Sequence, residues 1–172
     1  AVHVDPIEKK PLFHYLPTSR ALSIAAAGCN FECRFCQNWR IAQYRPEQIE
    51  SIVMPPEAVA AQAVKTGSDT IAYTYSEPVV FYGYMHDCAK EGRKKGIGSV
   101  MISNGFINEE PMKAVCRYLT GVKIDLKGFT ESFYREQCSG ELEGVLSTLK
   151  LLKKLDMWTE IVVLIIPTLN DS

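Results

Sequence analysis

Short apolar stretches alternate with amphipathic stretches along most of the chain. The apolar stretches are rich in β-branched and aromatic residues and have the length of buried strands, whereas the amphipathic stretches repeat apolar residues at helical spacing. The predicted strands are residues 21–27, 69–75, 98–104, 121–128 and 158–168. The predicted helices are residues 55–67, 78–96, 109–119, 130–137 and 140–156. This alternation predicts an α/β protein whose parallel sheet curls into a barrel or forms a doubly wound sheet.

Polar side chains follow each predicted strand. In parallel sheets the functional groups gather at the carboxyl ends of the strands. Those positions hold Cys29, Cys33 and Cys36 after the first strand, Ser76 and Glu77 after the second, Asn104 after the third, Asp125 and Lys127 on the fourth, and residues 168–171 after the fifth. We therefore expect these groups to meet at one mouth. Asp125 and Lys127 lie two positions apart on a strand and so share a face.

Composition and charge narrow the class of protein. The chain has 172 residues, 47% of them hydrophobic and 23% charged, which suits one globular domain. A net charge of −1 gives no reason to expect binding to nucleic acid or to an anionic membrane. No apolar run reaches the roughly 18 residues of a membrane span, and the first ten residues lack a signal-peptide pattern. We therefore expect a cytoplasmic protein, in which structural disulfides are rare.

Three cysteines fall within eight positions of the loop GCNFECRFC, and three interpretations compete for them. A disulfide joins two cysteines and would leave the third thiol without a partner. A zinc site needs a fourth ligand, and nothing in the sequence places His14 near the loop. An iron–sulfur cluster with only three thiolate ligands leaves one iron open for a substrate. Spacing alone favours the cluster over zinc only slightly.

Other residues have simpler explanations. Asp125 and Lys127 could form an ordinary ion pair, and His14 suits the surface or a hydrogen-bonded core position. Cys88 and Cys116 lie in predicted helices and suit buried apolar positions, whereas Cys138 precedes a Ser-Gly pair and is expected to be more exposed.

Four motifs, taken together, resemble one family. Residues 29–36 resemble the CxxxCxφC signature of radical S-adenosylmethionine (SAM) enzymes, with Phe35 as the aromatic residue. Residues 75–78 (YSEP) resemble the family's GGEP motif, with tyrosine and serine in place of both glycines. Residues 103–105 (SNG) and 125–127 (DLK) resemble the TNG and DLK motifs of the activating enzymes. More closely, the chain resembles the pyruvate formate-lyase activating enzyme-like branch, in particular the AmmeMemoRadiSam system proteins.

The resemblance implies a fold and a domain layout. It implies a partial (β/α)6 TIM-like barrel, of which this chain supplies about five βα units. Residues 1–20 would be an N-terminal extension, and residues 21–172 a radical SAM core domain truncated at its C-terminal end.

The resemblance also implies the cofactors and their ligands. Cys29, Cys33 and Cys36 would hold a 4Fe–4S cluster, and SAM would bind beside Phe35. Ser76 and Glu77 would meet the SAM ammonium group, Lys127 its carboxylate, and Asn104 and Asp125 its hydroxyl groups. Residues 165–167 would offer an apolar edge to adenine.

The implied activity is that of an oxidoreductase that forms a 5′-deoxyadenosyl radical. Its partners would be an electron donor such as flavodoxin or ferredoxin and a protein substrate, such as a glycyl radical enzyme. A small-molecule substrate is the alternative within the family. A non-catalytic zinc-binding domain is the alternative from another class.

Overall fold

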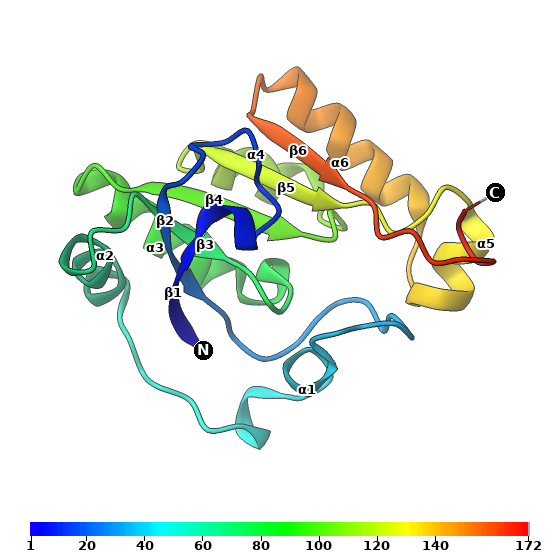
Figure 1. Cartoon of the computed structure of the whole chain (residues 1–172), viewed down its shortest axis with the longest axis horizontal. Helices are drawn as coiled ribbons and strands as arrows, with labels where there is room; N and C mark the ends of the chain where they lie inside the picture. Colours follow the sequence, from blue (N-terminus) through cyan, green and yellow to red (C-terminus); the bar gives the residue numbers. More distant parts are fainter. Residues whose placement is uncertain (172) are drawn as a thin grey trace.

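The computed structural model describes residues 1–171, and in this range six strands form one sheet (Figure 1). The strands are β1 (Val2–Pro6), β2 (Arg20–Ile24), β3 (Thr70–Tyr73), β4 (Gly98–Ser103), β5 (Gly121–Asp125) and β6 (Thr159–Val162). They lie in the sheet in the order in which they occur along the chain. β2 to β6 are parallel, and β1 is antiparallel to β2. The order shows a curled, unclosed sheet of the partial-barrel type, because a doubly wound sheet reverses its strand order.

Helices connect the parallel strands. They are α1 (Trp39–Ala42), α2 (Pro56–Lys65), α3 (Tyr82–Lys94), α4 (Glu109–Cys116), α5 (Glu131–Phe133) and α6 (Leu142–Lys154). α5 continues directly into a π-helical turn over Tyr134–Cys138. Short 3₁₀ turns occupy Ile7–Lys9, Pro46–Gln48 and Pro78–Phe81. These positions confirm the predicted strand–helix alternation, with ends that differ by a few residues.

The outer face of the sheet packs against the helices. Alternate strand residues such as Ile71, Met101 and Ile124 are fully buried there, together with Met85 of α3 and Val145 of α6. Because side chains alternate across a strand, the residues between them must point to the opposite, concave face.

The concave face is filled by the N-terminal segment. A second apolar cluster joins three residues of this segment to four inward residues of β2, β3 and β4: Ile7, Leu12, Tyr15, Ala21, Ala72, Val100 and Ile102. The carboxylate of Glu160 in β6 accepts hydrogen bonds from the backbone N–H groups of Phe13, His14 and Tyr15 at 2.9–3.1 Å. Residues 7–15 thus form a plug beneath the mouth of the barrel.

Two local features differ from the sequence analysis. β1 was not predicted, although it extends the sheet beyond β2. The last strand was predicted over residues 158–168, but β6 ends at Val162. The reason is Asn170, whose side-chain amide donates to the carbonyls of Leu164 and Lys127 and accepts from the N–H of Ile166, so the chain turns back on itself.

The structure also shows the environment of two single residues, Cys138 and His14. Cys138 was expected to be more exposed but is fully buried, because the π-helical turn and the left-handed Ser139 (φ 53°) direct it into the core. The His14 side chain lies at the surface beside Glu160.

Within residues 1–171, none of the helices combines the length and the apolar character that crossing a bilayer demands.

Leu12→Ala tests whether the plug stabilises the fold. Leu12 is completely buried, so its truncation should lower the free energy of unfolding by about 2–5 kcal/mol. The neighbouring Phe13 is 58% exposed, and Phe13→Ala should change stability by less than about 1 kcal/mol. Urea unfolding followed by circular dichroism measures both. Equal, small losses for the two variants would show that the plug is dispensable.

Candidate active site

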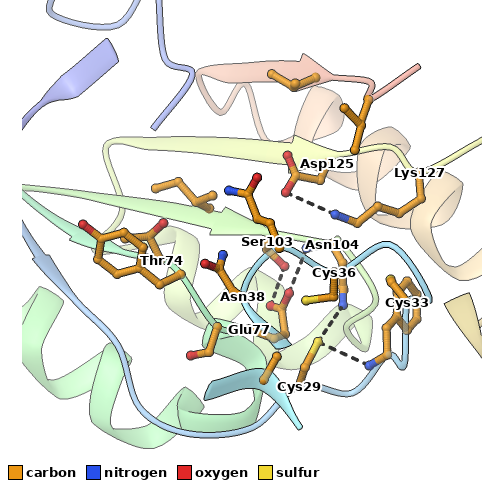
Figure 2. A pocket seen from close by; sticks show the side chains of 18 of the residues that line it. Cys29, Cys33, Cys36, Asn38, Thr74, Glu77, Ser103, Asn104, Asp125 and Lys127 are labelled. Carbon is orange, nitrogen blue, oxygen red and sulfur yellow. Dashed lines mark hydrogen bonds and ion pairs between the residues drawn. The ribbon is translucent and has the colours of Figure 1, made fainter. Parts of the chain in front are cut away.

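A cavity of about 450 Å³ opens at the carboxyl ends of the parallel strands. Nine candidate site residues of the sequence analysis line it: Cys29, Cys33, Phe35, Cys36, Ser76, Glu77, Asn104, Asp125 and Lys127. Residues 165–167 and 168–171 were also expected there but do not line it, because Asn170 turns the chain back after β6. Figure 2 shows Asp125 and Lys127 facing the cysteine loop, with Glu77, Ser103 and Asn104 between them. Residues from four separate loops therefore form one site.

The cysteine loop leaves β2 through a glycine. Gly28 has φ 106°, a conformation that glycine adopts readily, and its N–H donates to the carbonyl of Ile41 at 2.8 Å. Cys29, Cys33 and Cys36 are half-buried and are not in disulfides. Burial raises the pKa of the Cys29 thiol to about 11, and a bound cation would favour its deprotonation.

A fourth cysteine supports this loop. The thiols of Cys33 and Cys138 are hydrogen-bonded, which raises the pKa of Cys33. The backbone N–H of Glu32 donates to the carbonyl of Cys138, and that of Arg34 to the carbonyl of Gln137, both at 2.9 Å. The π-helical turn thus fixes the middle of the cysteine loop against the core.

Glu77 is a buried carboxylate that joins two of the loops. Its oxygens accept hydrogen bonds from the Ser103 hydroxyl (2.7 Å), the Asn104 N–H (2.8 Å) and the Val79 N–H (3.1 Å). Burial raises the pKa of Glu77 to about 7, although these hydrogen bonds oppose the rise. A buried carboxylate of this kind gains strongly from a cationic partner such as an ammonium group.

Asn104 connects Glu77 to the cysteine loop. Its side-chain amide donates to Asn30 Oδ1 at 2.8 Å and lies 3.9 Å from Cys29 Sγ, while its oxygen accepts from the N–H of Phe106. The Phe31 N–H also donates to Cys29 Sγ, at 3.4 Å. Donors directed at a sulfur atom favour its thiolate form.

Two lysines share one carboxylate on the opposite wall. Asp125 accepts from Lys127 Nζ at 3.3 Å through one oxygen and from Lys123 Nζ through the other. Burial lowers the pKa of Lys127, but Asp125 more than offsets this effect and the pKa is raised. The ion pair between Asp125 and Lys127 therefore exists, and it lies within the site.

Tyr75 adopts a backbone conformation that normally favours glycine. Its φ is 67°, which costs a residue with a side chain about 1–3 kcal/mol. The Tyr75 hydroxyl donates to Asp5 at 2.5 Å, and its ring lies 4.0 Å from the ammonium of Lys10. These contacts with the N-terminal segment offset the strain. They explain how the YSEP sequence forms a turn without the glycines of the motif that it resembles.

The sequence comparisons agree with this geometry. The profile of the radical SAM superfamily matches residues 23–172. The chain belongs to the radical SAM superfamily. A curated relative, "Uncharacterized protein MJ0808" of Methanocaldococcus jannaschii, is 46% identical over 169 residues, which are 98% of this chain and 50% of the relative. The chain therefore spans about half the length of that relative.

Solved structures of the same superfamily share the fold. TYW1 with a lysine–pyruvate adduct bound superposes with a TM-score of 0.64 and 24% identity, over 95% of this chain and 61% of that chain. A domain of a pyruvate formate-lyase activating enzyme from Bacteroides vulgatus superposes with a TM-score of 0.56 and 19% identity, over 61% of this chain and 65% of that chain. At these identities the similarity establishes the architecture of the radical SAM domain.

The thiols of the radical SAM domain suit an iron–sulfur cluster, because a cubane offers a separate iron to each thiolate. Three half-buried thiols on one cavity wall, with N–H donors directed at Cys29, therefore fit the 4Fe–4S cluster that membership of the superfamily implies.

Three lysines of the cavity were missed by the sequence analysis. Lys123 could have been found, because it lies two positions before Asp125 on the same strand and so shares its face. Lys9 and Lys10 line the cavity because residues 1–20 fold under the barrel, and no local pattern indicates this.

Glu77→Gln should remove a pH-dependent part of the stability. Because the pKa is raised from 4.5 to about 7, the folded protein binds this proton more tightly than the unfolded chain does. The stability of the cofactor-free protein should therefore fall as the pH rises through this range, by roughly 3 kcal/mol at about 1.4 kcal/mol per pH unit.

Urea unfolding between pH 4.5 and 8 measures this difference between wild type and variant. Glu143, whose side chain is 74% exposed, provides the control: Glu143→Gln should leave the pH profile unchanged. Parallel profiles for wild type and Glu77→Gln would contradict the assignment of the slope to Glu77.

Proposed function

We propose that this chain forms the SAM-cleaving core of a radical enzyme. The observation that carries the proposal is that three thiols of one loop and the polar groups suited to an amino-acid sulfonium line the same cavity. When bound, a reduced 4Fe–4S cluster supplies the electron that splits SAM into methionine and a 5′-deoxyadenosyl radical, which abstracts a hydrogen atom from the substrate.

In this proposal the residues on each side of the cavity bind a different part of the cofactors. Cys29, Cys33 and Cys36 hold the cluster, and their spacing leaves one iron for the amino and carboxylate groups of SAM. Glu77 faces the SAM ammonium, because a buried carboxylate with a raised pKa is stabilised by a cation. Lys127 faces the SAM carboxylate from the opposite wall.

The remaining groups orient and enclose the ligand. Asn104 and Asp125 offer hydrogen bonds to the ribose hydroxyls. The Ser76 hydroxyl already donates to the carbonyl of Ala26 at 2.6 Å, so Ser76 acts by holding the turn and leaves its oxygen as an acceptor. Phe35 packs against Phe133 at 5.9 Å between ring centroids and closes the cysteine side of the cavity to water.

The proposal also includes the substrate that gives up the hydrogen atom, which is the donor. The SNG and DLK motifs resemble those of activating enzymes, which supports a glycine of a partner protein as the donor. The lysine-rich interior of the cavity instead supports a small molecule with an anionic group, and this is the donor that we favour. The electron donor would be a flavodoxin or a ferredoxin, which implies a reducing compartment such as the cytoplasm.

Cys33→Ala should abolish the cluster while the fold survives. After anaerobic reconstitution with iron and sulfide, the full-length wild-type protein should hold about four irons and absorb visible light. With SAM and dithionite it should release 5′-deoxyadenosine. Cys33→Ala should lose the iron and the product but keep its far-ultraviolet circular dichroism.

Cys88→Ala is the matched control, because Cys88 is fully buried in the outer core and does not line the cavity. It should keep the iron and the product. A colourless wild-type protein with one tightly bound zinc and no 5′-deoxyadenosine would support the zinc-binding alternative. Full iron content in Cys33→Ala would overturn the ligand assignment.

A further inference from the structure

The deeper part of the cavity contains an unusual number of lysines. Lys9, Lys10, Lys123 and Lys127 all line it. Lys10 and Lys123 are almost completely buried, with side chains 1% and 5% exposed. Buried lysines are rare because the ammonium group loses its hydration, and those that occur are compensated by a counter-charge or by a ligand.

These lysines share two carboxylates. Asp5 is shared by Lys9 and Lys10, whose Nζ atoms lie 2.8 and 2.7 Å from its two oxygens. Asp125 is likewise shared by Lys123 and Lys127. Lys9 is 58% exposed, so water hydrates its ammonium group, whereas Lys10 and Lys123 are buried and each keeps N–H groups that its shared carboxylate does not accept.

Two further carboxylates near the cavity direct their oxygens to other hydrogen-bond donors. Glu160 is the neighbour of Lys123 in the sheet register, but its carboxylate binds three backbone N–H groups of the N-terminal plug. Glu77 binds donors of the β3 and β4 loops. Among the described residues, Asp125 is the hydrogen-bond acceptor of Lys123 Nζ, which leaves two of its three N–H groups for a ligand.

The register places Lys123 below the proposed SAM position. Lys123 precedes Asp125 by two residues on β5, which sets it about 7 Å deeper in the barrel. It lies beside Ile102, whose side chain packs on the apolar plug. Lys10 reaches the cavity from the plug, and its ammonium lies over the Tyr75 ring. Both lysines therefore line the same cavity.

We propose that Lys123 and Lys10 bind the anionic group, a carboxylate or a phosphate, of a small-molecule substrate beneath SAM. This inference rests on the proposed function and adds the chemical class of the substrate. The anion would accept the N–H groups of Lys123 and Lys10 that Asp125 and Asp5 leave free. The apolar residues of the plug and Ile102 would contact the carbon part of the same molecule.

Anion binding by the full-length protein tests the proposal. The probes are inorganic phosphate, followed by ³¹P line broadening, and [1-¹³C]pyruvate, followed by ¹³C line broadening, at constant ionic strength set with chloride. Both cofactor-free and cluster-loaded protein are titrated. Tighter binding of phosphate indicates a phosphorylated substrate, and tighter binding of pyruvate indicates an organic acid.

Lys123→Met and Lys10→Met should each weaken binding of the preferred anion at least about tenfold, because each loses a charge-assisted hydrogen bond. Lys123→Arg should retain binding to within about threefold. Lys150→Met is the matched control, since Lys150 is 73% exposed outside the cavity, and it should bind as wild type does. Circular dichroism verifies that each variant is folded.

Two results would overturn the inference. The first is binding that is equal in wild type, Lys123→Met and Lys10→Met, which would make the anion contact non-specific. The second is loss of anion binding at saturating SAM, which would assign these lysines to the SAM carboxylate. If the wild type forms no 5′-deoxyadenosine but binds the anion through Lys123, the proposed function fails while the anion site stands.

Discussion

The buried carboxylate of Glu77 is the interaction on which the arrangement of the site depends. It holds the Ser103 hydroxyl and the Asn104 N–H, and so fixes the loop after β4 to the loop after β3. Asn104 in turn reaches Asn30 and Cys29 of the cysteine loop. Three loops from separate strands are therefore positioned by one desolvated group, whose pKa is raised because burial outweighs its hydrogen bonds. A bound cation would stabilise the carboxylate and the loops together.

A second constraint comes from the N-terminal segment, which lies beneath the barrel. The N-terminal segment fills the concave face of the sheet with apolar residues and also places Lys9 and Lys10 in the cavity lining. Asp5 accepts hydrogen bonds from Ser23 and Tyr75 as well as from the lysines, which links the plug to β2 and to the strained turn that precedes Glu77. The same segment thus closes the barrel, supports the turn and contributes charge. Packing and chemistry share these residues, as is common where a half-enclosed sheet holds a ligand.

The positions of the elements and of most site residues could be predicted, because both depend on local patterns. Strand and helix periodicity located the parallel sheet, and the rule that parallel strands present their ligands at their carboxyl ends located Glu77, Asn104 and Asp125. The predicted ends of helices and strands were less accurate where a side chain distant in sequence determines where the element ends. β6 is short because Asn170 binds the carbonyls of Lys127 and Leu164. Cys138 is buried because a π-helical turn, which no hydrophobic pattern encodes, directs it toward Cys33.

By itself the sequence determined the α/β class, the cysteine loop and the residues that line the mouth of the barrel, since each follows from neighbours along the chain. Only the tertiary structure decided what surrounds those residues. Lys10 meets Tyr75, and Lys10 and Lys123 line the same cavity, because the curled sheet brings the N-terminal segment and β5 together. The lysines of the cavity come from residues far apart in sequence. Such a cluster has no local signature, because burial exists only once the chain is folded.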